Sequence, residues 1–175
     1  MLLTPRSSSL GFTFIEVMIA VVIMGVMLAY ALPNYSTWIK NSHIRNASES
    51  VLNGLQRARA EAVVRNASVS FQITADTNLW TVTDVATGEL IFAKPMAEIS
   101  PSITYTVLPA GATTVVFGNL GTVTNGAAAI TQIDFDTSDL PAEDSRNLRV
   151  TLGAGGAVRT CDPDPGIAAS DPRHC

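Results

Sequence analysis

The residue with the clearest chemical meaning is Glu16, a single carboxylate inside an apolar run. The run Phe12–Leu32 has 21 residues and no other charge, and it directly follows Gly11. At ~1.5 Å per residue, a helix of this length spans roughly 30 Å, about the hydrocarbon core of a bilayer. A carboxylate in such a helix costs about 2.5–3.5 kcal/mol on insertion scales. Glu16 is therefore expected to have a partner that offsets this cost.

The only two cysteines, Cys161 and Cys175, lie together in the C-terminal tail. No C-x-x-C motif is present, and the histidines His43 and His174 are far apart in the sequence. A domain behind a membrane segment is expected to be exported, and an isolated cysteine pair there predicts a disulfide. Closing a loop of about 15 residues stabilises a fold by roughly 3 kcal/mol in the chain-entropy model. The alternative is two free thiols in a cytosolic protein.

Two groups of aspartates invite a comparison with calcium sites, but neither has the EF-hand spacing. We expect Asp134 and Asp136 of the first group to lie on one solvated strand face. We expect turns in the second group because Asp-Pro pairs favour them, with calcium binding as the alternative. No G-x-S-x-G, P-loop or H-E-x-x-H motif is present, so the sequence predicts no catalytic residues, resident metal or cofactor. The groups are Asp134, Asp136 and Asp139, and Asp162, Asp164 and Asp171.

The segment Gly11-Phe12-Thr13-Phe14-Ile15-Glu16 resembles the processing site of type IV prepilins and pseudopilins. The resemblance implies that a prepilin peptidase removes residues 1–11 by cutting between Gly11 and Phe12. It also implies that the new amine of Phe12 is N-methylated. An α-amino group has a reference pKa of roughly 7.7–8.0 and is largely charged at neutral pH. Glu16 is then expected to pair with this amine of a neighbouring subunit and to register its assembly.

Three other interpretations of the apolar segment compete with processing at Gly11. A secretory signal would have its apolar core at Val17–Leu28 and a cleavage site at Ala29-Tyr30-Ala31. A simple one-span anchor would leave Gly11 and Glu16 unexplained. Glu16 could also be a snorkelling acid, since it lies only about one turn inside Phe12. The acid before the apolar core and the helical pattern beyond Ala31 favour the prepilin interpretation.

The elements that would position these residues begin with one long helix, roughly Phe12–Asn66. Pro33 is expected to kink or interrupt it, because proline lacks the amide donor and clashes with the preceding turn. Beyond Pro33, apolar residues recur at gaps of three and four, which marks one buried helix face. That face consists of Ile44, Ala47, Val51, Leu55, Ala58 and Ala62.

From Ala67 the pattern changes to alternating β-formers separated by turn residues. Short strands after one helix predict an α+β domain, in which the long N-terminal helix packs on an antiparallel β-sheet. The resemblance to prepilins implies that this fold is pilin-like. The first half of that helix would span the membrane. We expect a leader at 1–11, a transmembrane and assembly helix at 12–32, its amphipathic continuation at 33–66, and a β-rich domain with a C-terminal disulfide loop at 67–175. The expected strands are Ser68–Ala75, Leu79–Val85, Leu90–Phe92, Ile103–Val107, Thr114–Phe117, Ile130–Phe135, Leu148–Leu152 and Ala157–Thr160.

The order of these parts is similar to the GspH/FimT family of minor pilins and pseudopilins. The resemblance rests on the helix end 55–62 (Leu-Gln-Arg-Ala-Arg-Ala-Glu-Ala), the segment 117–121 (Phe-Gly-Asn-Leu-Gly) and the tail 156–163 (Gly-Ala-Val-Arg-Thr-Cys-Asp-Pro). The closing residues 171–175 (Asp-Pro-Arg-His-Cys) are similar to the FimT-like branch. The resemblance implies a non-enzymatic minor pilin that assembles into or primes a type IV pilus, with a type II secretion pseudopilin as the alternative. Its partners would be other pilin subunits, the prepilin peptidase and inner-membrane lipid. The chain would cross the inner membrane once and would have a periplasmic C-terminal domain.

The tail arginines raise a second alternative, a pilus-associated receptor subunit that binds DNA during uptake. FimT-like relatives carry a G-R-x-R motif, and the matching residues here are Gly156-Ala157-Val158-Arg159, so one of the two arginines is missing. The net charge of −4 also argues against a generally nucleic-acid-seeking surface. We expect the arginines to pair with nearby acids such as Asp144 and Asp162, with DNA contact as the alternative. The candidate arginines are Arg146, Arg149, Arg159 and Arg173.

Overall fold

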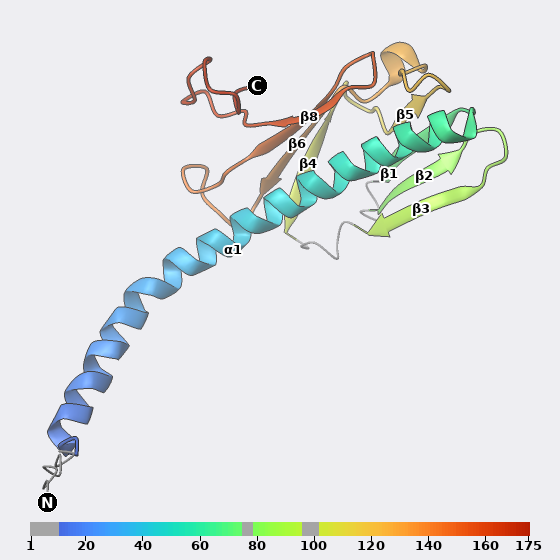
Figure 1. Cartoon of the computed structure of the whole chain (residues 1–175). Coiled ribbons are helices and arrows are strands. Elements are labelled where there is room, and N and C mark those ends of the chain that lie inside the picture. Colours follow the sequence, from blue (N-terminus) through green and yellow to red (C-terminus); the bar gives the residue numbers. More distant parts are fainter. Residues whose placement is uncertain (1–10, 75–78, 96–101) are drawn as a thin grey trace, which may run out of the picture. The chain divides into compact units, whose positions relative to one another are not determined.

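The computed structural model describes residues 11–74, 79–95 and 102–175. The leader residues 1–10, the expected strand end at Ala75 and the expected turn at 76–78 lie outside this described part. The chain divides into two units between Ser36 and Thr37, and the helix α1 (Phe14–Arg65) contributes residues to both (Figure 1). The helical assignment is continuous across Pro33, so the helix is not interrupted there. Loss of one amide donor leaves the neighbouring backbone hydrogen bonds to carry the helix through this position.

The C-terminal end of α1 is fixed by its backbone. Asn66 has a left-handed φ of 50°, a conformation that asparagine adopts more readily than most residues. The amide of Ala67 donates to the carbonyl of Ala62 at 3.1 Å, and the amide of Asn66 donates to Val63 at 3.3 Å. These two bonds form a Schellman motif, which ends the helix and turns the chain into the first strand.

Among the residues that the structure describes, eight strands follow α1 and form two four-stranded sheets. The pairings within each sheet are antiparallel, in the orders β3-β2-β1-β5 and β4-β6-β7-β8 (Figure 1). Every expected strand is present within a few residues of its expected bounds, but the sequence did not predict the division into two sheets. The strands are β1 Val69–Thr74, β2 Leu79–Asp84, β3 Leu90–Pro95, β4 Ile103–Leu108, β5 Thr114–Phe117, β6 Gln132–Thr137, β7 Leu148–Leu152 and β8 Val158–Cys161.

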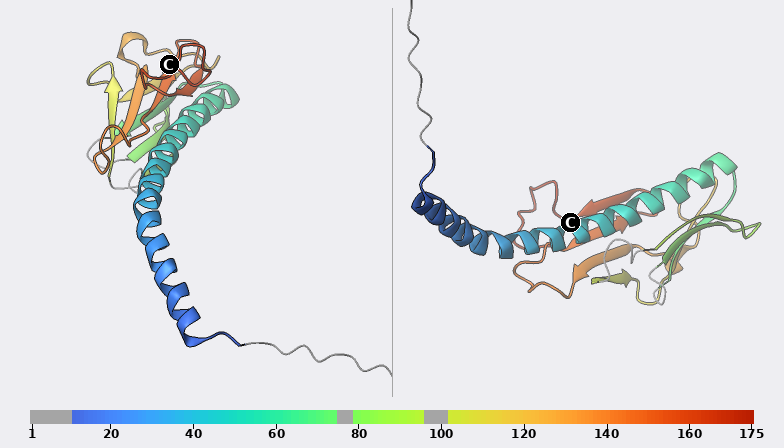
Figure 2. Two further views of the ribbon diagram at one scale, coloured as in Figure 1. Left: turned by 90° about the vertical axis from the view of Figure 1, so that its left-hand side faces the viewer. Right: turned by 90° about the horizontal axis from the view of Figure 1, so that it is seen from below.

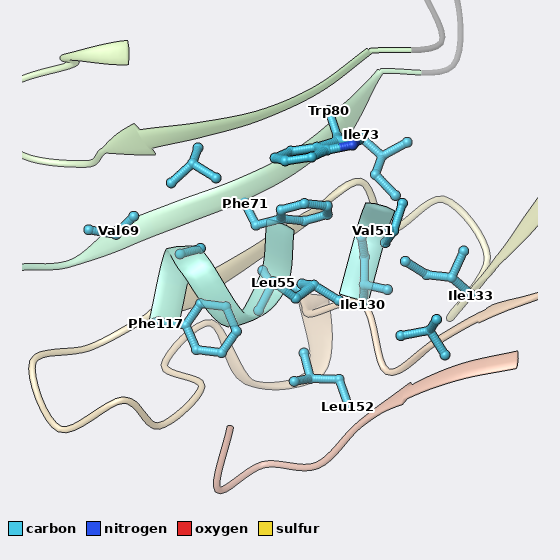
Figure 3. Close-up of a cluster of buried hydrophobic side chains, with 14 of the residues drawn as sticks. Val51, Leu55, Val69, Phe71, Ile73, Trp80, Phe117, Ile130, Ile133 and Leu152 are labelled. Carbon is cyan, nitrogen blue, oxygen red and sulfur yellow. The ribbon is translucent and has the colours of Figure 1, made fainter. Parts of the chain in front are cut away.

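The part of α1 from Thr37 onward packs along both sheets (Figure 2). Its apolar face is fully buried, as the periodicity predicted, and it shares one core with both sheets (Figure 3). Gly54 allows the closest approach, because a Cβ at this position would lie 2.8 Å from the rings of Phe71 and Trp80. The indole Nε1 of Trp80 also donates to Ser50 Oγ at 3.2 Å, so the helix and the sheet are joined by a satisfied polar contact.

A second contact joins α1 to the β7–β8 hairpin through the 118–121 turn. Arg59 Nε donates to the carbonyl oxygen of Gly121 at 3.0 Å. Gly156, in the hairpin turn, has a φ of 77°, and a Cβ there would clash with that same carbonyl. Glycine at position 156 is therefore required both by the backbone conformation and by the close approach.

Candidate assembly segment and tail loop

The expected processing site lies in a non-helical stretch. Gly11, Phe12 and Thr13 precede the helix, and all three are exposed. A Cβ built on Gly11 would meet nothing within 4 Å. The peptide bond between Gly11 and Phe12 is therefore outside regular secondary structure and accessible from the surface of this unit.

Glu16 sits in the first turn of α1 and makes a reciprocal contact with Thr13. The amide of Glu16 donates to Thr13 Oγ1 at 3.3 Å, and the amide of Thr13 donates to Glu16 Oε2 at 3.5 Å. This arrangement is a capping box, in which an N-cap threonine and a glutamate three residues later satisfy two amides at the helix start. The carboxylate is also favourably placed near the positive end of the helix dipole. The sequence analysis missed this role of Thr13, although the T-x-x-E pattern signals it.

The apolar half of α1 exposes its large side chains all around. Together with Phe12, which directly precedes the helix, thirteen large apolar side chains up to Leu28 have exposed fractions between 50% and 84%. By length and composition α1 can cross a membrane, and its most apolar stretch is not buried within the protein. A helix that is apolar on every side needs a lipid or protein environment. The residues are Phe12, Phe14, Ile15, Val17, Met18, Ile19, Val21, Val22, Ile23, Met24, Val26, Met27 and Leu28.

The tail is closed by the expected disulfide between Cys161 and Cys175, whose Cα atoms lie 5.1 Å apart. Backbone bonds support the closure, because the amide of Asp162 donates to Arg173 O at 2.7 Å and the amide of Cys175 donates to Asp162 O at 3.3 Å. Arg149 of β7 pairs in register with Cys161 of β8. The base of the tail loop is therefore fixed to the second sheet.

Two of the four candidate arginines are engaged by carboxylates. Arg149 Nε and Nη2 donate to the two oxygens of Asp134 at 2.6 and 3.0 Å, a bidentate pair across β6 and β7. Arg173 holds Asp171 in the same bidentate manner, at 3.1 and 2.7 Å. Arg173 thereby lowers the pKa of the Asp171 carboxyl to about 2. The expected pairings with Asp144 and Asp162 are wrong, because strand register and a local turn bring other acids closer.

The remaining two arginines are exposed. Neither Arg146 nor Arg159 has a carboxylate within 4 Å among the residues that the structure describes. Arg159 lies on β8 opposite Thr151, two register positions away from the Arg149–Cys161 pair. The four arginines therefore do not form one group of available cations, and multivalent phosphate contact depends on such a group.

Asp134 on β6 and the aspartates of the tail accept hydrogen bonds from neighbouring groups, as expected for a solvated strand face and for turns. Asp134 accepts from Arg149 and from Gln132 Nε2, the latter at 2.8 Å, on a solvated strand face. In the tail, the carboxylate of Asp162 accepts the amide of Asp164, and that of Asp164 accepts the amide of Gly166, as turn-forming aspartates do. Within the described ranges, no group of three potential metal ligands is present.

Comparison with known structures gives the fold of this chain. The type IV minor pilin FimU of Pseudomonas aeruginosa superposes with a TM-score of 0.56 at 16% identity, over 72% of this chain and 96% of the other. The minor pseudopilin EpsH from the type 2 secretion system of Vibrio cholerae superposes with a TM-score of 0.51 at 15% identity, over 71% and 99% respectively. A comparison with curated protein sequences gave no significant match.

Two family models match the sequence itself. The prokaryotic N-terminal methylation motif matches residues 6–32, which contain Gly11, Phe12 and Glu16. The model of type II transport protein GspH matches residues 47–156, from the buried face of α1 to the β7–β8 hairpin. Because this second match covers more than half of the sequence and agrees with the observed pilin-like fold, the chain belongs to the GspH family.

Proposed function

We propose that this protein is a non-enzymatic minor pilin that is anchored in a membrane until it assembles into, or primes, a type IV pilus. The observation that carries the proposal is the apolar half of α1, which is exposed on all sides and has one carboxylate in its first turn. Such a segment is stable in lipid and also among similar helices in a filament core. Other pilin subunits are therefore its partners after assembly.

Processing between Gly11 and Phe12 gives the segment its second charge. A prepilin peptidase cuts the exposed bond, and the new amine of Phe12 is methylated. A cation at a helix N-terminus is repelled by the helix dipole, so the free amine favours a nearby carboxylate. Glu16 of one subunit supplies that carboxylate to the amine of the next, and each charge offsets the desolvation cost of the other.

The proposed cellular location is based on the apolar helix and on the disulfide of the globular domain. The apolar helix makes a single pass through the inner membrane, and residues from Thr37 onward form the periplasmic domain. The Cys161–Cys175 disulfide supports an oxidising compartment for this domain. The structural relatives include both a pilus subunit and a secretion-system subunit, so a type II secretion pseudopilin is the alternative. The disulfide-closed tail favours the pilus.

N-terminal sequencing and intact mass of the protein from membranes test the proposal. We expect a mature chain that begins at Phe12 and carries one added methyl group. Gly11→Val is the matched control, because a bulky residue before the cut should leave the leader attached while α1 remains intact. A chain that begins at Leu32 would establish secretory cleavage after Ala31 and would remove the pilin assignment.

A further inference from the structure

The last strand of the second sheet, β8, has an open outer edge. The sheet order β4-β6-β7-β8 gives it a neighbouring strand on one side only. The amide of Gly153 donates to Ala157 O at 2.9 Å, so the backbone of Ala157 points toward β7. Because backbone groups alternate in direction along a strand, those of Val158 and Thr160 point away from β7. Among the residues that the structure describes, neither has a backbone partner on that side.

The tail shows that this edge accepts a further strand. Asp162, two residues beyond Thr160, has the same backbone direction and forms a parallel bridge with the tail. Its amide donates to Arg173 O at 2.7 Å, and its carbonyl oxygen accepts the amide of Cys175 at 3.3 Å. The pairing does not continue along Thr160, since the amide of Arg173 donates to Asp171 Oδ1 instead. Part of the β8 edge is therefore paired, and the part next to it is open.

The edge of the first sheet is protected in a way that β8 is not. Lys94 and Pro95 end β3, and the register between β3 and β2 shifts between Val82 and Thr83. Lysine, proline and bulges are the usual means by which proteins prevent strand addition at an edge. The sequence of β8 is Val-Arg-Thr-Cys, and its register with β7 is regular. Its edge is therefore suited to pairing with another strand.

A groove of about 600 Å³ lies between this edge and the end of α1. Its lining includes Ala60 and Val63 of the helix and Val158 of β8. Val158 lies opposite Leu152, which is buried, so its side chain is on the core side of the sheet. Side chains alternate between the two faces of a strand. A strand added to β8 would thus direct every second side chain into the groove, over small and apolar residues.

Two arginines without a carboxylate partner flank the open edge. Arg59 lines the groove, and its Nε donates to Gly121 O at 3.0 Å, which holds the side chain in place. Arg159 lies opposite Thr151, on the other face of β8 from Val158. Neither arginine has a carboxylate within 4 Å in the described ranges. One cation on each face favours an incoming strand that carries acids.

We propose that the open edge of β8 binds an extended acidic segment of a partner protein by strand addition. Backbone hydrogen bonds to Val158 and Thr160 supply the affinity, as in other edge-strand complexes. Small apolar side chains of the segment fill the groove, and its carboxylates meet Arg59 and Arg159. The ligand is thus an extended peptide in which small apolar and acidic residues alternate. This site belongs to the globular domain and goes beyond the proposed pairing of Glu16 with an amine.

Fluorescence anisotropy with the full-length protein in detergent tests the proposal. The probe is a labelled peptide of sequence Val-Glu-Val-Glu-Val-Thr, for which we expect saturable binding. The same peptide with an N-methylated backbone cannot donate hydrogen bonds to the edge and should bind at least tenfold more weakly. Amide exchange of Val158 and Thr160 should slow when the first peptide binds. Absence of saturable binding, equal binding of the N-methylated peptide, or unchanged exchange at both residues would overturn the proposal.

Substitutions in β8 supply the second arm. Val158→Pro removes an outward N–H group and should weaken binding roughly tenfold, because proline is tolerated at a strand edge but cannot donate. Val158→Ala is the matched control, which keeps that group and should bind within a few-fold of the unaltered protein. If Val158→Pro does not fold, the N-methylated peptide still tests the same hydrogen bonds in the unaltered chain.

Charge reversal tests the acidic character of the ligand. Arg159 is exposed, so Arg159→Glu should leave the fold intact. It should lower the affinity for the glutamate peptide roughly tenfold and raise the affinity for Val-Lys-Val-Lys-Val-Thr. Equal effects of the two Val158 substitutions, or an affinity indifferent to charge reversal, would contradict the proposal. These measurements need no filament, so their failure is distinct from a failure of the proposed function.

Discussion

Glu16 caps its own helix, and we propose that it also pairs with a neighbouring subunit; substitutions at this position can distinguish the two roles. Glu16→Gln keeps an amide oxygen that can complete the capping box with Thr13, but it removes the charge. Glu16→Ala removes both. Thr13→Ala removes the cap and leaves the carboxylate. If the charge pairs with the amine of a neighbouring Phe12, both Glu16 variants should fail to assemble and Thr13→Ala should assemble nearly normally.

The magnitudes separate the variants clearly. Removing one partner of a buried ion pair costs about 3–5 kcal/mol, and loss of the carboxylate also removes about 2.5–3.5 kcal/mol of insertion cost from the membrane-bound state. Both effects disfavour transfer from lipid to filament. We therefore expect incorporation to fall by a factor of about one hundred or more, since 1.4 kcal/mol corresponds to tenfold. Loss of a helix cap costs about 1 kcal/mol, so Thr13→Ala should lower incorporation at most several-fold.

The assay is the fraction of each variant in sheared filaments relative to the membrane fraction, measured by immunoblotting against a constant amount of the other subunits. Membrane insertion should be unimpaired in all three variants, and this serves as the internal control. Wild-type incorporation of Glu16→Gln together with failure of Glu16→Ala would show that Glu16 acts only as a helix cap. Wild-type incorporation of Glu16→Ala would refute the pairing with a neighbouring amine and would show that the helix cap does not affect assembly.

Three further predictions concern the tail. Cys161→Ala with Cys175→Ala should cost at most roughly 3 kcal/mol and should increase amide exchange in residues 162–175, while exchange in β1–β7 is unchanged. The pKa of Asp171 falls from 3.8 to about 2 in the fold, so its contribution to tail stability is complete above about pH 4 and is lost as the pH falls toward 2. Asp171→Asn should flatten that dependence in an NMR titration, and an unchanged titration would contradict the Asp171–Arg173 pairing. DNA binding by the full chain in detergent should be weak and steeply salt-dependent, reduced by Arg159→Ala and increased by Ala157→Arg. Tight binding at moderate salt would contradict a purely structural role.

The sequence predicted what depends on local pattern. The apolar periodicity of α1 located its buried face, and alternation located the eight strands, because both patterns are set by neighbouring residues on one element. The disulfide was predicted correctly because Cys161 and Cys175 are the only two cysteines of the sequence and lie close together in the tail. The capping box could also have been predicted, because Thr13 and Glu16 have the T-x-x-E spacing of that motif.

Features that depend on strand register could not be predicted in the same way. Arg149 meets Asp134 because β6 and β7 pair these two positions directly, and a shift by one residue would send either side chain to the opposite face. The division into two sheets likewise depends on β4 pairing with β6 while β5 pairs with β1. Lys40 and Asn41 meet the 139–146 segment across about 100 residues of sequence, and no local pattern records that contact.

The distribution of burial along α1 explains how one helix can serve two environments. Among the described residues, every buried core side chain lies at Ile44 or beyond, and all of them belong to the unit 37–175. The apolar side chains before Leu28 contribute nothing to that core, so their burial must come from lipid or from other subunits. In the proposed function, moving this segment from a membrane to a filament exchanges one apolar environment for another without opening the domain core. In the proposed function, the free-energy difference between the two environments is governed largely by the few polar groups in the segment, so we expect the carboxylate of Glu16 to control the transfer.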